Sequence, residues 1–284
     1  MEIISKIKRG LRYIIKGVPT YYTTANVVLI EPSNKLRGNN IIVTGGGRGL
    51  GYAMAKKFVH EGANVLIAGR NIEKLEKSAG ELQCKALFLD VQDVSSFPSF
   101  LELAERSLGG NINCLVNNAG ISLHEGNFMK VTPESFDNQF NTNLRGGYFL
   151  TQKFIKYVDD NNISKANVLF ITSEKGIFVD DMPYGLTKCA LNSLTQALAN
   201  EYIRKGIRIN AIAPGVTTSD MTGYKPEGNL YANFQMNRRL YLPEEVAEIA
   251  SFILSDAAHC LSGQIIAVNE GKTVNRPLEI RCFD

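Results

Sequence analysis

Short apolar runs rich in β-branched residues alternate with longer segments of helical periodicity between residues 40 and 270. The runs predict strands at 40–44, 64–68, 86–90, 112–116, 167–172, 207–212 and 264–268. The segments between them predict helices at 50–61, 71–79, 95–107, 133–158, 183–205 and 243–254. Parallel strands need crossover connections, which are usually helices. The predicted fold class is therefore α/β: a single domain with a doubly wound seven-stranded parallel sheet and helices on both faces.

No repeat or linker divides the alternating region, so we predict one domain over residues 38–272. Residues 216–239 form a long connection with Gly, Pro and Asn between a strand and a helix. Connections of that length in a compact domain are often lids. We therefore interpret 216–239 as a substrate lid loop and residues 273–284 as a C-terminal tail.

Residues 1–37 are predicted to form a basic amphipathic extension. The first 40 residues carry seven Lys and Arg against two Asp and Glu, so this segment is +5 and the remainder −2. Within residues 3–16, Ile and Leu side chains share one helical stripe. Three alternatives are open for this helix: docking on its own domain or a sister subunit, peripheral membrane contact through residues 1–17, or a flexible tail.

Composition excludes several classes of function. The main body is slightly acidic, which gives no support for a nucleic acid partner. No apolar run approaches the roughly 20 residues of a membrane span. Five scattered cysteines without CxxC spacing favour a reducing, cytoplasmic location over a disulfide framework or a zinc cluster. The three histidines lie far apart in the sequence, so no metal site is predicted and a Ser-His-Asp triad is not favoured.

The segment TGGGRGLG, from Thr44 to Gly51, lies between the first predicted strand and a helix. Glycines there allow a tight turn and a close approach of the backbone, so that a pyrophosphate can bind free N–H groups at the positive end of the helix. Dinucleotide binding is predicted for Thr44, Gly45, Gly47, Arg48, Gly49, Leu50 and Gly51.

The second predicted strand ends in Gly69-Arg70-Asn71, without the carboxylate that commonly binds the ribose 2′-hydroxyl of NAD. A 2′-phosphate is repelled by a carboxylate and attracted by arginine. Arg48 can reach the same phosphate as Arg70. The sequence therefore favours NADP(H) over NAD(H), with Asn71 also at the cofactor.

Tyr184 and Lys188 are four residues apart, on one face of a predicted helix. A tyrosine with a pKa of about 10 is a poor proton donor and acceptor near neutrality, and a neighbouring cation lowers that pKa. The pair can therefore serve in proton transfer. The spacing alone is weak, since such pairs are common on helix surfaces.

The glycine-rich segment and the Tyr184–Lys188 pair occur together with four further motifs, and with all six the sequence resembles the short-chain dehydrogenase/reductase family over residues 38–272. This region would be its Rossmann-fold catalytic domain. The motifs are TGxxxGxG at 44–51, NNAG at 117–120, Asn143 within NLRG, Ser173, YxxxK at 184–188 and Pro214-Gly215. The resemblance implies a nicotinamide-dependent oxidoreductase acting on the CH–OH group of donors. Its catalytic residues would be Asn143, Ser173, Tyr184 and Lys188.

The same resemblance implies a role for each catalytic residue. Tyr184 would be the general acid and base for a ketone or secondary alcohol, while Ser173 would hold and polarise its oxygen. Lys188 would bind the nicotinamide ribose and lower the Tyr184 pKa, and Asn143 would hold a water between Lys188 and solvent. Further implied cofactor contacts are Asp90, Val91, Asn117, Asn118, Ala119, Gly120, Pro214, Gly215, Val216, Thr217 and Ser219. A homodimer or homotetramer is also implied.

The substrate is the most open part of the prediction, because loops decide specificity. Asp180 and Asp181 make the loop before the YxxxK motif acidic, which favours a sugar-derived or other polar ketone. An alternative is 3-oxoacyl-[acyl-carrier-protein] reductase-like activity, weakened by Phe149 and Asn200 at positions where such reductases tend to carry arginines. An alternative of another class is a non-catalytic NADP(H)-binding sensor or structural subunit.

Overall fold

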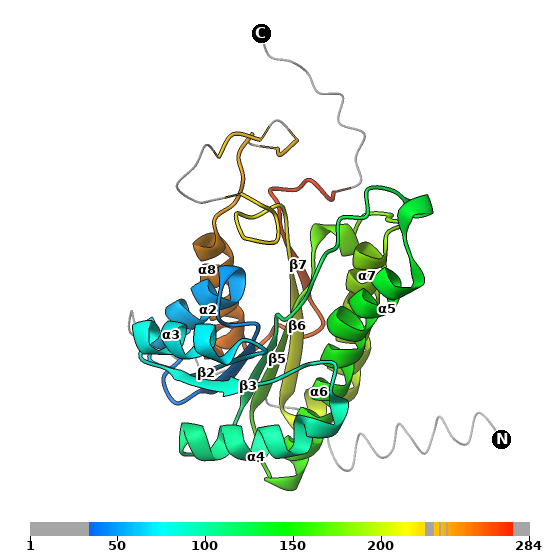
Figure 1. Ribbon diagram of the computed structural model, residues 1–284. Coiled ribbons are helices and arrows are strands. Elements are labelled where there is room, and N and C mark those ends of the chain that lie inside the picture. Colours follow the sequence, from blue (N-terminus) through cyan, green and yellow to red (C-terminus); the bar gives the residue numbers. More distant parts are fainter. Residues whose placement is uncertain (1–33, 225–229, 233, 237, 275–284) are drawn as a thin grey trace, which may run out of the picture.

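Seven parallel strands form the central sheet of the computed structural model, which describes residues 34–224, 230–232, 234–236 and 238–274 (Figure 1). The strands are β1 (Asn40–Thr44), β2 (Asn64–Gly69), β3 (Lys85–Phe88), β4 (Cys114–Asn117), β5 (Ala166–Ile171), β6 (Ile207–Pro214) and β7 (Ile265–Val268). Their order across the sheet is β3-β2-β1-β4-β5-β6-β7. The fold class predicted from the sequence is confirmed.

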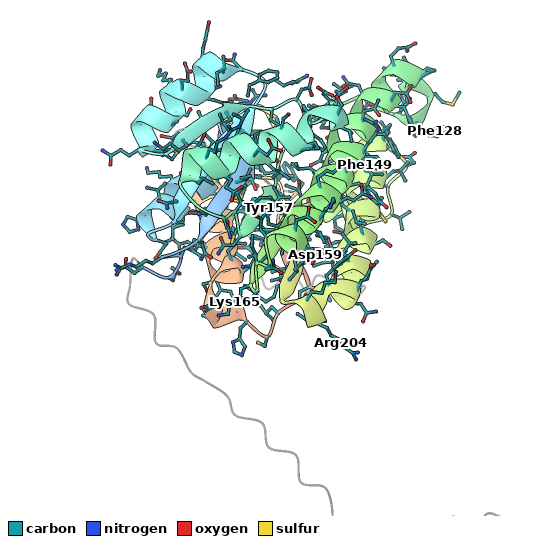
Figure 2. The ribbon with its side chains drawn as sticks, turned by 90° about the horizontal axis from the view of Figure 1, so that it is seen from below. Phe128, Phe149, Tyr157, Asp159, Lys165 and Arg204 are labelled. Carbon is teal, nitrogen blue, oxygen red and sulfur yellow. The ribbon has the colours of Figure 1, made fainter. Side chains whose placement is uncertain are left out.

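Helices cover both faces of the sheet. One layer contains α2 (Gly49–His60), α3 (Ile72–Leu82) and α8 (Pro243–Leu254), and the other contains α4 (Phe97–Leu108), α6 (Gly146–Asp160) and α7 (Pro183–Tyr202). Figure 2 shows the second layer from below, with Phe149 and Tyr157 on α6. Successive strand residues point to opposite faces, so Ile41 joins the core with α2 while Ile42 joins the core with α4 and α6. Burial on both faces explains the continuous apolar runs of the sequence.

Short helices lie in the connections. They are the 3₁₀ turns η1 (Val94–Ser96), η2 (Phe128–Lys130), η4 (Glu174–Gly176), η5 (Ile203–Lys205) and η6 (Asp256–Ala258), with α5 (Pro133–Gln139) and the π-helical η3 (Phe140–Arg145). The single helix predicted at 133–158 is therefore wrong in detail, because it divides into α5, η3 and α6. A Cβ on Gly146 would lie 2.5 Å from the carbonyl oxygen of Val91, so glycine permits this close approach at the start of α6. Short π-helical segments are frequent at functional sites.

The strand order places a switch point between β1 and β4. From β1 the chain proceeds to β2 and β3 on one side and then returns to β4 on the other side. Connections leaving β1 and β4 therefore diverge to opposite faces, and a crevice opens at the carboxyl edge of the sheet. The segment that follows β6 lies above this edge in Figure 1.

The predicted helix at 3–16 lies outside the described residues. Among the helices that the structure does describe, none combines the length and apolar character needed to span a bilayer.

Gly206, between η5 and β6, has a φ of +78°, and a Cβ there would overlap the carbonyl oxygen of Ser164. We expect Gly206→Ala to lower the free energy of unfolding by about 2–4 kcal/mol, measured by urea denaturation. Gly80→Ala is the control, because its methyl group would meet nothing within 4 Å inside α3. It should gain up to about 1 kcal/mol from helix propensity. Equal stabilities of the two variants would contradict this account of Gly206.

Candidate functional site

The glycine-rich segment is tied to the end of β4 by Thr44. Its hydroxyl accepts hydrogen bonds from the N–H groups of Asn118 and Ala119, each at 3.0 Å, and donates to the carbonyl of Val116 at 3.2 Å. The Asn118 amide donates in turn to the carbonyl of Thr44 at 2.9 Å. These bonds join the carboxyl ends of β1 and β4.

The segment itself depends on glycine at particular positions. Gly45 and Gly49 have φ of +66° and +53°, a conformation that residues with a β-carbon rarely adopt. A Cβ on Gly51 would overlap the carbonyl oxygen of Gly45 and crowd the Asn118 amide. Helix α2 can therefore begin this close to the loop only because Gly51 has no side chain.

A cavity of about 490 Å³ runs along this edge of the sheet, from the start of α3 to the start of α7. Predicted cofactor residues that line it are Gly45, Gly47, Arg48, Gly49, Leu50, Gly51, Arg70, Asn71, Asp90, Val91, Asn118, Ala119, Gly120, Tyr184, Lys188 and Ser219. Its lining does not include Thr44, Asn117, Pro214, Gly215, Val216 or Thr217. Asn117 instead donates to the buried hydroxyl of Thr151 at 2.9 Å, so it links the end of β4 to α6 beneath the cavity lining.

Three cationic side chains border one end of the cavity: Arg48, Arg70 and Lys74. Sequence reasoning missed Lys74, although it lies in the first turn of α3, where its N–H bonds to the Asn71 side chain at 2.9 Å. Asp220, also missed, pairs with Arg48 at 3.0 Å and lies 3.8 Å from Lys74. Within the described residues, the Arg70 side chain makes no ion pair. This end of the cavity therefore fits a ligand group that carries more than one negative charge.

Tyr184 and Lys188 line the other end, from the first turns of α7. The Lys188 ammonium lies 5.6 Å from the centre of the Tyr184 ring and donates to the carbonyl of Ile171 at 2.9 Å. Ser173, at the end of β5, is buried, and its hydroxyl accepts from the N–H of Lys175 at 3.2 Å. It is also close enough to the Tyr184 hydroxyl to influence the pKa of that group. The structure thus brings Ser173, Tyr184 and Lys188 together.

Burial controls the ionisation of the pair. Desolvation lowers the pKa of Lys188 from 10.5 to about 8, because the charged ammonium loses water. Desolvation raises the pKa of Tyr184, and the hydrogen bond with Ser173 only opposes that rise. Ser173 is the neighbour that favours the phenolate of Tyr184. A role for Lys188 in lowering the Tyr184 pKa stays a prediction.

Asn143 lies in the π-helical η3 and is buried. Its amide binds Ile121 at both backbone groups: the oxygen accepts from N–H at 2.8 Å and the nitrogen donates to C=O at 2.9 Å. The nitrogen also donates to the Thr187 hydroxyl at 3.3 Å. A Cβ on Gly120 would lie 3.2 Å from Asn143 and 3.5 Å from Lys188. Asn143 therefore holds in place the connection after β4, whose Gly120 lies next to Lys188.

The acidic rim expected from Asp180 and Asp181 is only half present. Asp180 has a buried side chain that pairs with Lys175 at 3.3 Å and accepts from the N–H of Met182 at 3.1 Å. Only Asp181 is exposed. No group of three potential metal-ligating side chains gathers anywhere in the described part of the chain.

A family model described as enoyl-(acyl carrier protein) reductase matches residues 45–273. The oxidoreductase UcpA of Salmonella typhimurium is 32% identical over 87% of this chain and 98% of its own. A 3alpha-hydroxysteroid dehydrogenase of Mediterraneibacter gnavus is 32% identical over 82% of this chain and 96% of its own. The crystal structure of a 3-ketoacyl-(acyl-carrier-protein) reductase from Brucella melitensis complexed with NADH has a TM-score of 0.77 and 30% identity, covering 84% of this chain and 100% of that chain.

The chain belongs to the short-chain dehydrogenase/reductase family. It is an oxidoreductase that acts on an alcohol or ketone with a nicotinamide cofactor, as the family does.

The pKa of Lys188 predicts a pH-dependent stability. It is about 8 in the folded protein and 10.5 ordinarily, so between these values the unfolded chain binds more protons and stability rises with pH. We expect Lys188→Met to be more stable than wild type at pH 7 by about 1–3 kcal/mol, with the difference shrinking towards pH 10. Urea denaturation across this range measures it. Lys130→Met, which changes an exposed lysine, is the control, and a constant difference for Lys188→Met would contradict the prediction.

Proposed function

We propose that this protein is an NADPH-dependent oxidoreductase that interconverts a ketone and a secondary alcohol, with Tyr184 as general acid and base. The observation that carries the proposal is one continuous cavity. It has the glycine-rich loop with Arg48 and Arg70 at one end, and Tyr184 with Lys188 at the other.

The residues of the Tyr184 end have distinct roles in this proposal. In the reductive direction Tyr184 donates its hydroxyl proton to the substrate carbonyl oxygen, so that negative charge does not accumulate there. Ser173 hydrogen-bonds to the same oxygen. Lys188 binds the ribose hydroxyls of the cofactor, and Asn143 keeps Ile121 and Gly120 in place beside it. When bound, the nicotinamide supplies or accepts the hydride.

The preference for NADP(H) is supported by Arg48, Arg70 and Lys74 at one end of the cavity and by the absence of a carboxylate at residues 69–71. Arginine binds phosphate strongly through charge-assisted hydrogen bonds. The Brucella reductase was crystallised with NADH, so the comparison of the two cofactors is the direct test.

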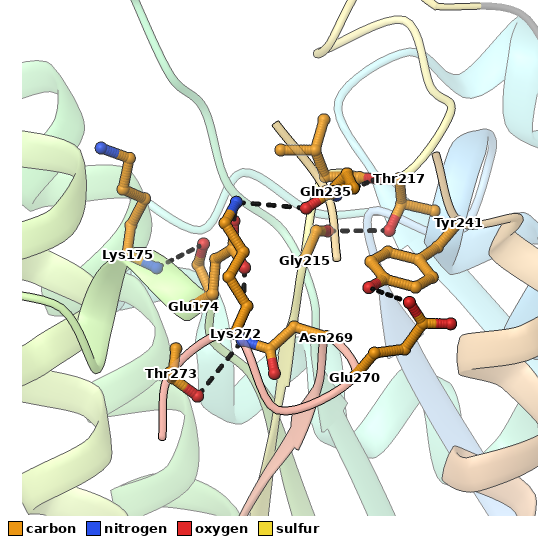
Figure 3. A network of polar contacts seen from close by, with 12 residues as sticks. Glu174, Lys175, Gly215, Thr217, Gln235, Tyr241, Asn269, Glu270, Lys272 and Thr273 are labelled. Carbon is orange, nitrogen blue, oxygen red and sulfur yellow. Dashed lines mark hydrogen bonds and ion pairs between the residues drawn. The ribbon is translucent and has the colours of Figure 1, made fainter. Parts of the chain in front are cut away.

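A polar ketone, such as one derived from a sugar, is our proposed substrate. Its support is a buried polar network directly after Ser173 (Figure 3). The Glu174 carboxylate accepts from Lys272 at 2.9 Å and from Asn269 at 3.3 Å, and Lys272 also donates to Gln235 at 3.1 Å. Polar side chains from three separate connections therefore gather around Glu174, the residue that follows Ser173 in the chain, although they do not line the cavity itself.

A second candidate is 3-oxoacyl-[acyl-carrier-protein] reductase-like activity, favoured by the likeness to the Brucella enzyme. Phe149 is not arginine, but the Arg145 guanidinium lies over its ring at 5.5 Å, so the helix does present a cation there. A non-catalytic NADP(H)-binding protein is the candidate of another class. The convergence of Ser173, Tyr184 and Lys188 weighs against it.

The test is NADPH and NADH oxidation against keto-sugars, 3-oxoacyl thioesters and simple diketones. Tyr184→Phe should lower kcat by about 10²–10⁴-fold while NADPH still binds, because only the proton donor is lost. Tyr202→Phe, near the other end of α7, is the control and should keep full activity. Tight NADPH binding without turnover of any substrate would support the non-catalytic candidate, and faster turnover with NADH would overturn the cofactor preference.

We also propose a cytoplasmic homodimer or homotetramer. An apolar groove of about 600 Å³ separates η3 and α6 from α7, and Phe140, Leu144, Tyr148, Phe149, Ala190 and Leu194 line it. Tyr148 is 44% exposed, and a second copy of the chain would remove this apolar surface from water.

Light scattering after size exclusion tests the assembly. We expect Tyr148→Asp to shift the wild-type dimer or tetramer to a smaller species, because a charge in an apolar interface loses its hydration. Leu103→Asp on α4 is the control, since Leu103 is 47% exposed and lies outside the groove. A monomeric wild-type protein would refute the proposal.

A further inference from the structure

Residues Ser219 to Thr222 form a turn that lies against the glycine-rich loop. The N–H of Ser219 donates to the Thr222 hydroxyl at 3.1 Å, and that hydroxyl donates to the carbonyl of Thr217 at 2.7 Å. A Cβ on Gly49 would lie 3.6 Å from the Cβ of Ser219, which is ordinary contact. Ser219, Asp220 and Met221 all line the cavity. We call residues 219–222 the strap.

The strap is attached on two sides of the cavity. On one side Asp220 pairs with Arg48 of the glycine-rich loop at 3.0 Å, and Lys74 of α3 lies 3.8 Å away. On the other side the carbonyl of Met221 hydrogen-bonds with the His124 ring at 2.9 Å. His124 belongs to the connection that follows β4. The strap therefore spans the opening between the two connections that diverge at the switch point.

Asp220 places a carboxylate where the local sequence has none. The end of β2 offers only Gly69, Arg70 and Asn71, yet Asp220 reaches the same group of cations from the connection after β6. Arg48 and Asp220 are both exposed, with side chains 64% and 63% accessible. Ion pairs between exposed side chains contribute little to stability, so little free energy is lost when one is broken. Arg48 and Lys74 can therefore leave Asp220 and bind another anion with little loss of free energy.

We propose that Asp220 is a specificity-determining residue that competes with the adenosine 2′-phosphate of NADP(H) for Arg48 and Lys74. This inference rests on the proposed NADP(H) preference. When no phosphate is bound, Asp220 pairs with the two cations. When NADP(H) binds, the Asp220 carboxylate repels its 2′-phosphate and competes for the same cations. Asp220 therefore reduces the ratio of the affinity for NADP(H) to the affinity for NAD(H). Binding of the phosphate frees the strap from the glycine-rich loop, while NAD(H), which lacks the phosphate, leaves the pair intact.

Isothermal titration with 2′,5′-ADP and 5′-AMP tests the competition on the full-length protein. The two ligands differ only in the 2′-phosphate, and their binding needs no turnover. Asp220→Asn should tighten 2′,5′-ADP by about three- to fivefold, because the competing charge is removed while the shape is kept. Binding of 5′-AMP should be unchanged. Asp181→Asn, an exposed acid outside the cavity, is the matched control and should change neither ligand.

The outcomes separate this inference from the proposed function. If wild type prefers 2′,5′-ADP and Asp220→Asn leaves its affinity unchanged or weakens it, the competition is refuted while the NADP(H) preference stands. If wild type binds both ligands equally, the NADP(H) preference fails. In that case tighter binding of 2′,5′-ADP by Asp220→Asn still supports the role of Asp220, and an unchanged affinity refutes both.

Discussion

The hydrogen bonds of Thr44 hold together the two strand ends between which the site is built. Helices leave β1 and β4 towards opposite faces of the sheet, so without a tie the two connections would be free to separate. The buried Thr44 hydroxyl uses its donor and both acceptor positions to close that gap. The glycine-rich loop on one side and Gly120 on the other are therefore presented at a fixed separation. Each bond contributes about 0.5–1.5 kcal/mol, yet the geometry of the cavity depends on all three.

The fold could be predicted because its signals are local. Strands buried on both faces produce apolar runs, and crossover helices produce 3.6-residue periodicity, so the seven strands are found in the sequence within two or three residues of their places. The π-helical segment was missed, because an extra residue in one turn hardly disturbs the apolar periodicity of a long helix. Gly146, the residue that follows the segment, lies close to the Val91 carbonyl, and no local pattern contains this tertiary contact.

In the candidate site too, residues of local motifs could be predicted and residues brought together by tertiary packing could not. Residues within the glycine-rich and YxxxK motifs were predicted, since their spacing along the chain fixes their spacing in the structure. Lys74 and Asp220 were not, because their meeting depends on how α3 and the connection after β6 pack together. Asp180 was predicted as an exposed rim residue, but its side chain is buried against Lys175. Charge in a loop sequence does not reveal which partner neutralises it.

Charge is left incompletely compensated at both ends of the cavity. Lys188 is buried with a backbone carbonyl as its acceptor, and the loss of hydration lowers its pKa to about 8. A buried carboxylate beside Lys188 would offset this loss, but it would also occupy the ammonium and compete with any hydroxyl brought to it. At the other end Asp220 reaches Arg48 and Lys74 but leaves Arg70 without an ion pair among the described residues. The protein thus gives up stability at the buried Lys188, whereas leaving the exposed Arg70 without an ion pair costs little. At both ends of the cavity a positively charged side chain stays available to a bound ligand.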